Sequence, residues 1–110
     1  MAIYKTSDHA KDERIITNWY QNDYKECSEA VLKVCEGYGY ELIHRDDNYG
    51  EFIFKRPKDT LDVKIISMTR RETAIDFVIN SGTIFDFGRS KIVIADLYDR
   101  LKRELRFYRK

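Results

Sequence analysis

Apolar side chains recur with a helical period near both ends of this chain and with a period of two in its middle. After residue 22 the apolar positions fall three or four residues apart, which predicts an amphipathic helix. These positions are Tyr24, Cys27, Val31, Val34, Cys35 and Tyr38. Asp23 and Glu26 form a capping-box pattern at the helix start, and Gly37 and Gly39 mark its end.

Alternation of apolar and polar residues from 40 to 82 predicts four strands in two hairpins. In the first hairpin, YELIHRD (40–46) and EFIFKRP (51–57) flank the turn cluster DNYG, and Pro57 ends the second strand. In the second hairpin, LDVKIISMT (61–69) and TAIDFVINSG (73–82) flank RRE.

A second helix is predicted to begin at Ser90, whose hydroxyl is expected to cap it. Its apolar stripe is expected to comprise Ile94, Leu97, Tyr98, Leu101, Leu105 and Tyr108. Two amphipathic helices need one apolar surface to cover, so we expect an α+β fold: a two-layer α/β sandwich in which both helices cover one face of a four-stranded antiparallel meander, in the order αββββα. Residues 1–110 are expected to form a single domain, with 1–22 irregular or strand-like. AIYK is a possible short strand, and RIITNWY (14–20) is expected to be a strand or an anchoring segment, because Trp19 and Tyr20 are costly to leave in water.

The composition is that of a soluble globular protein, with 43% hydrophobic and 35% charged residues and a net charge of +1. The start of the chain lacks the apolar run of a signal peptide, and no apolar stretch approaches the length of a membrane span. Cys27 and Cys35 lie eight residues apart on one predicted helix, about 12 Å from each other, which is too far for a disulfide. These features predict a cytoplasmic protein with two buried, reduced thiols.

Two tripeptides have the letters of protein-kinase signatures, HRD at 44–46 and DFG at 86–88. The residue five positions after Asp46 is Glu51, where a kinase has a metal-binding asparagine. No kinase lysine motif is present, and 110 residues cannot hold two kinase lobes. The kinase interpretation is therefore excluded, and the letters are assigned to local turns.

The last third of the chain resembles a bacterial domain family of unknown function. The resemblance rests on a strand ending in a small residue and glycine, followed by Asp-x-Gly at the entry to a terminal helix. The matching residues are Ser81, Gly82, Asp86, Gly88, Ser90, Lys91 and Val93, with valine where that family has isoleucine. The loop here is one residue longer. The resemblance supports the fold and implies no activity.

Residues suited to catalysis or metal binding are few. His9 is followed closely by Asp12 and Glu13, but a solvated charged segment has the same composition. His44 follows Tyr40 and Leu42 on the side of its strand expected to face the helices, where we interpret it as an edge histidine. We therefore expect no enzyme activity, no metal and no cofactor.

Basic residues are concentrated at the C-terminus, where residues 100–110 carry six basic side chains and one acidic, or +5. The first 99 residues must then sum to −4, because the whole chain is +1. This asymmetry indicates an anionic partner, although the helix dipole alone also favours cations at a helix end. The predicted nucleic-acid-binding residues are Arg70, Arg71, Arg100, Lys102, Arg103, Arg106, Arg109 and Lys110.

The face of the sheet away from the helices is the other candidate surface. Strict alternation places an apolar residue of every strand on it; these are Ile43, Ile53, Ile66, Met68 and Val78. An apolar centre with a charged rim is typical of an interface. The alternative is that residues 1–22 fold over this face. We predict a non-enzymatic interaction module that binds protein or self-associates through this face, and alternatively a nucleic-acid-associated protein.

Overall fold

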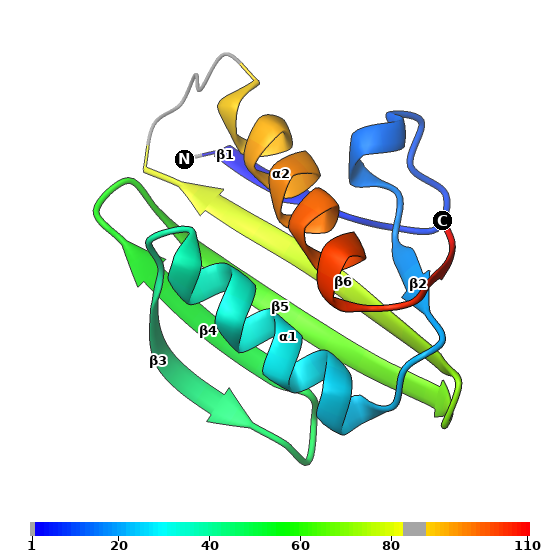
Figure 1. Cartoon of the computed structure of the whole chain (residues 1–110). Helices are drawn as coiled ribbons and strands as arrows, with labels where there is room; N and C mark the ends of the chain where they lie inside the picture. The colour runs from blue at the N-terminus through cyan, green and yellow to red at the C-terminus, as the bar shows by residue number, and fades with distance from the viewer. Residues whose placement is uncertain (1, 83–87) are drawn as a thin grey trace.

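The computed structural model describes residues 2–82 and 88–110, with both helices on one face of a single antiparallel sheet (Figure 1). The elements in chain order are β1 (Ala2–Lys5), the 3₁₀ helix η1 (Glu13–Ile15), β2 (Asn18–Tyr20), α1 (Tyr24–Gly37), β3 (Glu41–Asp46), β4 (Glu51–Arg56), β5 (Asp59–Thr69), β6 (Glu72–Ser81), α2 (Arg89–Glu104) and β7 (Phe107–Arg109). The α+β class and the placement of the helices are as predicted. The sheet, however, has seven strands rather than four.

The three extra strands extend the sheet beyond β6. Its order is β3-β4-β5-β6-β2-β7, and β1 also pairs with β6. Both β1 and β2 run antiparallel to β6: β1 pairs along Val78–Ser81 and β2 along Thr73–Ile75. The N-terminal segment therefore supplies one interrupted strand beside β6. The excursion between its two halves contains η1, which packs against α2 on the helix side of the sheet.

The interruption is closed by two threonines and an aspartate. Thr6 bonds Phe77 twice: its amide donates to the Phe77 carbonyl at 3.0 Å, and its hydroxyl oxygen accepts from the Phe77 amide at 2.9 Å. The hydroxyls of Thr6 and Thr17 both donate to the Asp76 carboxylate. Both threonines are buried. Their hydrogen bonds therefore give partners to buried backbone and hydroxyl groups that would otherwise have none where the strand pairing is interrupted.

The core lies between the sheet and the two helices. It contains both aromatic and aliphatic side chains of the alternating strands, among them Phe52, Phe54 and Phe77, together with the predicted inward residues of α2. The capping box at the start of α1 is formed as predicted: the Asp23 carboxylate accepts from the Glu26 amide at 2.8 Å. Cys27 and Cys35 are buried and unbridged.

The prediction for the last helix was wrong at both ends. The helix begins at Arg89 after Gly88, which adopts a positive φ of 80°, so Ser90 lies inside the helix and is not its cap. At the other end, Leu105 is already extended and the chain turns into β7. Tyr108 is therefore not part of the helical stripe. Asp86, which belongs to the family resemblance and to the kinase-like tripeptide, lies outside the described residues.

Neither helix of the described chain is long and apolar enough to cross a membrane.

Gly50 is the last residue of the turn before β4 and has a conformation that other residues rarely adopt, with φ +64°. A Cβ at this position would overlap the carbonyl oxygen of Ile65. The two residues are held together because the Ile65 amide donates to the Gly50 carbonyl at 2.8 Å. We expect Gly50→Ala to lower the free energy of unfolding by about 2–3 kcal/mol, because strain and overlap add. Gly37→Ala is the matched control, since no described atom outside its chain neighbours and its own helix backbone lies within 4 Å of the added carbon. Urea denaturation of both variants tests this, and equal stabilities would contradict it.

Candidate binding surfaces

The outer face of the sheet carries the five predicted interface residues, and the described chain leaves it open to solvent. Ile43, Ile66 and Met68 are 53%, 41% and 65% exposed, while Ile53 and Val78 are half-buried. The segment 2–22 does not cover them, because β1 and β2 lie in the sheet itself, beside β6, and η1 lies against α2. Ile3 of β1, 63% exposed, adds a further apolar side chain to this face.

A bulge at Ile43 changes the predicted orientation of β3. Leu42 pairs with Phe54, but the next pair is His44 with Ile53, so Ile43 is an extra residue in the strand. His44 consequently faces outward beside Ile53, and the prediction that it faces the helices was wrong. Arg45 turns inward instead, and its guanidinium lies 5.0 Å from the ring centre of Phe52.

A second bulge occurs at Met68, near the end of β5. The pairing with β6 shifts between Ser67 and Thr69, and the Ser67 hydroxyl donates to the Thr69 carbonyl at 2.9 Å. This bond holds the extra residue in place. Met68 is exposed as predicted, but through a bulge rather than through strict alternation.

Charged residues run across the middle of the outer face. Glu51 of β4 pairs with Lys64 of β5, and Lys64 pairs with Asp76 of β6; on the other side Glu51 pairs with Asp46 of β3, so one lysine lies among three carboxylates in this row. This row separates Ile66 from Ile53 and Val78. The face is therefore a mixed surface, and the expected apolar centre inside a charged rim is not present.

Ile66 belongs to a small cluster on one side of this row. The cross-strand neighbours here are Ile66, Ala74 and Trp19, in that order across β5, β6 and β2. Ala74 is almost fully buried because its larger neighbours flank it. The Arg109 guanidinium lies 4.8 Å from the centre of the Trp19 ring, and the Trp19 indole N–H donates to the Asp8 carboxylate at 3.1 Å. The segment 14–20 was predicted to be a strand or an anchoring segment, and its last three residues form β2.

Asp62 is the most perturbed carboxyl of this face. It lies on the row of Ile53 and Val78, close to Glu51. Partial burial, followed by the negative charge of Glu51, raises the pKa of Asp62 from 3.8 to about 6. Lys64 and His44 act in the opposite direction and are weaker.

The predicted basic residues lie in several places rather than on one helix. Arg100, Lys102 and Arg103 are in α2, whereas Arg106, Arg109 and Lys110 follow it. The Arg100 guanidinium lies 4.7 Å from the ring centre of Tyr38, at the end of α1, and its described ring contact includes none of the other predicted basic residues.

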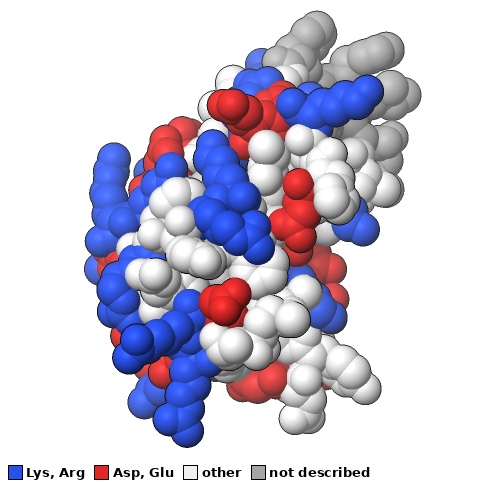
Figure 2. Space-filling view, turned by 90° about the vertical axis from the view of Figure 1, so that its right-hand side faces the viewer, with Lys and Arg blue, Asp and Glu red and all other residues white. Residues whose placement is uncertain are grey.

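Two of the basic residues meet at the hairpin tip. Arg71 and Arg106 line one pocket of about 310 Å³ together with Gln21. Arg106 is held there because its guanidinium donates to the Gln21 carbonyl at 2.9 Å and its amide donates to the Asn22 side chain at 2.7 Å. Figure 2, which faces the side of the molecule with β2 and the C-terminus, shows blue side chains gathered over its left and lower parts and scattered red ones between them.

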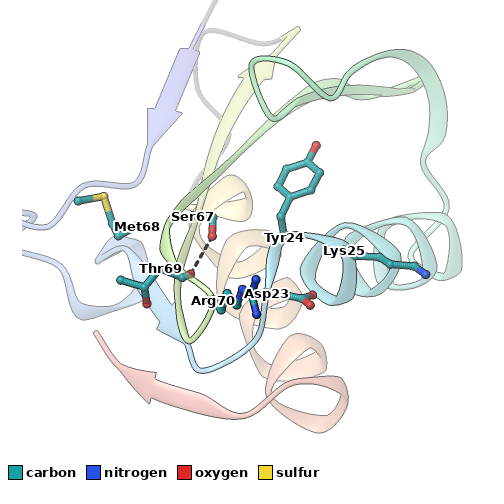
Figure 3. Close-up of a pocket in the computed structure, with 7 residues that line it drawn as sticks. All are labelled: Asp23, Tyr24, Lys25, Ser67, Met68, Thr69 and Arg70. Carbon is teal, nitrogen blue, oxygen red and sulfur yellow. Dashed lines mark hydrogen bonds between the residues drawn. The ribbon is translucent and has the colours of Figure 1, made fainter.

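An open depression of about 610 Å³ lies where the end of β5 meets the start of α1 (Figure 3). Its lining includes Met68 from the predicted interface and Arg70 from the predicted basic set. In Figure 3 the Met68 side chain points away from α1, whereas Tyr24 and Lys25 come from that helix. The depression thus connects the two surfaces at the hairpin end of the sheet.

The thiols are poorly suited to chemistry. Burial raises the pKa of Cys27 to about 12 and raises that of Cys35 further, so neither is a thiolate near neutral pH. Within the described residues, no group of three or more His, Cys, Asp or Glu side chains is arranged to hold a metal ion.

No protein-family model matches this chain, and a comparison with curated proteins finds no match. The resemblance of the C-terminal third to a bacterial family of unknown function therefore stays a prediction.

The raised pKa of Asp62 makes stability depend on pH. The folded protein holds this proton more tightly than the unfolded chain, so the contribution of Asp62 to stability is full below about pH 4 and is lost as pH rises through 6. Asp62→Asn should therefore stabilise the protein at pH 7 by about 1 kcal/mol after allowance for solvent screening. The gain should disappear near pH 4.

Asp47→Asn provides a control of opposite sign. Hydrogen bonds from Tyr24 and Arg45 lower the pKa of Asp47, so its contribution is present at neutral pH and is lost as pH falls. This variant should be destabilised at pH 7. Denaturation at pH 4 and pH 7 checks both, and a pH-independent effect of Asp62→Asn would contradict the assignment.

Proposed function

We propose that this protein is a cytosolic, non-enzymatic interaction module that pairs with a second copy of itself through the outer face of its sheet. The observation that carries the proposal is the exposure of Ile43, Ile66 and Met68 on a face that the described N-terminal segment leaves open. Packing a second sheet against a face with solvent-exposed apolar side chains removes them from water, which lowers the free energy of the pair.

The charged row supports a second copy rather than an unrelated partner. A two-fold axis that runs along the strands between β4 and β5 brings Glu51 of each copy onto Lys64 of the other. The Glu51–Lys64 contact, made twice across the axis, is the complementary part of the interface, whereas the two ends of the row, Asp46 and Asp76, are both acidic. Interdigitation of side chains from two such faces also removes water from the isoleucines on either side of the row.

The buried, unbridged thiols support the cytosolic and non-enzymatic parts of the proposal. Free cysteines persist in a reducing compartment, and thiols with pKa values this high are weak nucleophiles. The carboxyls and the two histidines, in turn, are distributed over turns and outer surfaces and do not converge in a buried cleft of the described chain.

Ile66→Asp tests the interface. The variant should keep its melting temperature because Ile66 is partly exposed in one subunit, and its dimer should weaken by about 100-fold because a carboxylate would be buried without a partner. Ile92→Asp is the matched control, since Ile92 is an exposed isoleucine of α2 on the helix layer. Light scattering over a range of concentrations measures both. A wild-type protein that stays monomeric at high concentration contradicts self-association.

Nucleic acid is the second candidate partner, and one observation favours it. Arg71 and Arg106 converge on one pocket, and beside them the edge strand β7 presents Phe107 and Tyr108, both partly exposed. Cations together with exposed aromatic rings are the groups that bind single strands, through phosphate contacts and base stacking.

Arg71→Gln combined with Arg106→Gln should weaken binding of a fluorescent oligothymidylate by about tenfold or more and reduce its salt dependence by about two counterions. Lys55→Gln with Lys58→Gln removes the same charge from the other end of the sheet and is the control. Fluorescence anisotropy at several salt concentrations measures the effect. Absence of binding at low salt, or equal loss in both double variants, rejects this candidate.

A further inference from the structure

Asp62 lies in the middle of the outer sheet face, between two apolar side chains of the proposed interface. Its cross-strand partners are Ile53 of β4 and Val78 of β6. The neighbours of Asp62 in its own strand, Leu61 and Val63, are buried in the core, so strand alternation directs the Asp62 side chain to the outer face. Asp62 is half-buried there. A carboxyl group therefore lies among the apolar area that a second copy would cover.

The charged groups around Asp62 come from every neighbouring strand. They are His44 of β3, Glu51 and Lys55 of β4, Lys64 of β5, Asp76 of β6 and Lys5 of β1. The negative charge of Glu51 acts on Asp62 more strongly than the opposing charges of Lys64 and His44 do. Asp62 thus lies in surroundings that disfavour its ionised form.

The other carboxylates of this part of the face have partners. Asp46 accepts hydrogen bonds from two turn amides at 2.9 and 3.3 Å. Asp76 accepts from the two buried threonine hydroxyls at the interruption beside β6. Glu51 lies opposite Lys64. Asp62, in contrast, has no ion pair and no N–H donor among the described contacts, and the charge that influences it most is another carboxylate.

The two-fold arrangement described above places Asp62 of each copy against Ile53 of the other. This follows because the axis runs between β4 and β5, and the two residues are a cross-strand pair. An ionised carboxylate in this contact loses its water without gaining a partner, which is costly. A protonated carboxyl avoids this cost, because it is neutral and can donate its proton to Glu51.

We propose that self-association is controlled by protonation of Asp62, so that each subunit takes up one proton at this carboxyl when two copies pair through the outer face. The inference rests on the proposed function and names its regulation. Partial burial, followed by the charge of Glu51, already raises the pKa of Asp62 to about 6 in the single subunit. Contact with Ile53 of the other copy raises this pKa further, so association is strongest below about pH 6 and weakens as pH rises above it.

Sedimentation equilibrium between pH 5.5 and 8 tests the proposal. The Kd of the wild-type dimer should be nearly constant below about pH 6 and rise by up to about 100-fold per pH unit above it, because two protons are taken up per dimer. Asp62→Asn is neutral at every pH. It should pair at pH 7.5 as tightly as the wild type does at pH 5.5 and lose the pH dependence.

Two control variants identify the titrating group. Asp99→Asn removes the same charge from an exposed position of α2 and should keep the wild-type pH dependence. His44→Gln removes the histidine of the same face, because histidine side chains also change charge near neutral pH. This variant should keep the pH dependence as well. Calorimetric dilution in phosphate and Tris, whose ionisation enthalpies differ, should show about two protons released per dimer that dissociates near pH 7.

The possible failures are distinguishable. A wild-type protein that stays monomeric from pH 5.5 to 8 contradicts the proposed function and this inference with it. A dimer whose Kd does not change with pH, or changes equally in Asp62→Asn, overturns the role of Asp62 and leaves self-association intact. A pH dependence that is lost in His44→Gln assigns the proton to the histidine and also overturns the inference.

Discussion

Phe77 lies at the point where the strand beside β6 is interrupted, and its two peptide hydrogen bonds decide whether the sheet continues. Thr6 supplies both partners, one from its backbone and one from its hydroxyl. Asp76 then joins Thr6 to Thr17, the residue that leads into the second half of the strand. These contacts bridge the gap between the part of β6 that pairs with β1 and the part that pairs with β2, and β2 in turn carries β7 and the C-terminus.

The interruption between β1 and β2 also determines what lies on each face of the sheet. Because β1 and β2 are in line rather than adjacent, the residues between them must leave the plane of the sheet. They leave it on the helix side, where η1 packs against α2. The opposite face consequently receives no cover from the described chain, and its isoleucines stay in water. One interruption in a strand thus accounts for both the position of η1 on the helix layer and the open outer face.

The predictable parts of the fold are those where local pattern and burial agree. Asp23 and Glu26 form a capping box from side chains three residues apart, so their own spacing predicts the contact. Leu97 and Leu101 are buried as the helical period requires, and Phe52 and Phe54 as alternation requires. In each of these cases the determining residues are close neighbours in sequence.

The features that could not be predicted depend on distant partners. The bulge at Ile43 exists only relative to the pairing of β3 with β4, and it reverses the orientation of His44 and Arg45. The three residues of β7 carry no detectable period and are held by their pairing with β2, so the sequence placed them at the end of the last helix; β2 was expected only as a strand or an anchoring segment, and its pairing with β6 decides between the two. The charged row on the outer face likewise arises from register: Glu51, Lys64 and Asp76 are separated in sequence and become neighbours only across strands.

The bulge at Ile43 has a consequence for how the protein behaves at high concentration. β3 is an edge strand of the sheet, and an unpaired edge is a template on which another chain can add a strand and start a fibril. An extra residue in the strand breaks the regular spacing of its free amides and carbonyls, and Glu41 and Asp46 place carboxylates at its two ends. The edge is thereby a poor template for ribbon growth, and the protein is expected to stay in solution at concentrations where a flat edge strand would polymerise.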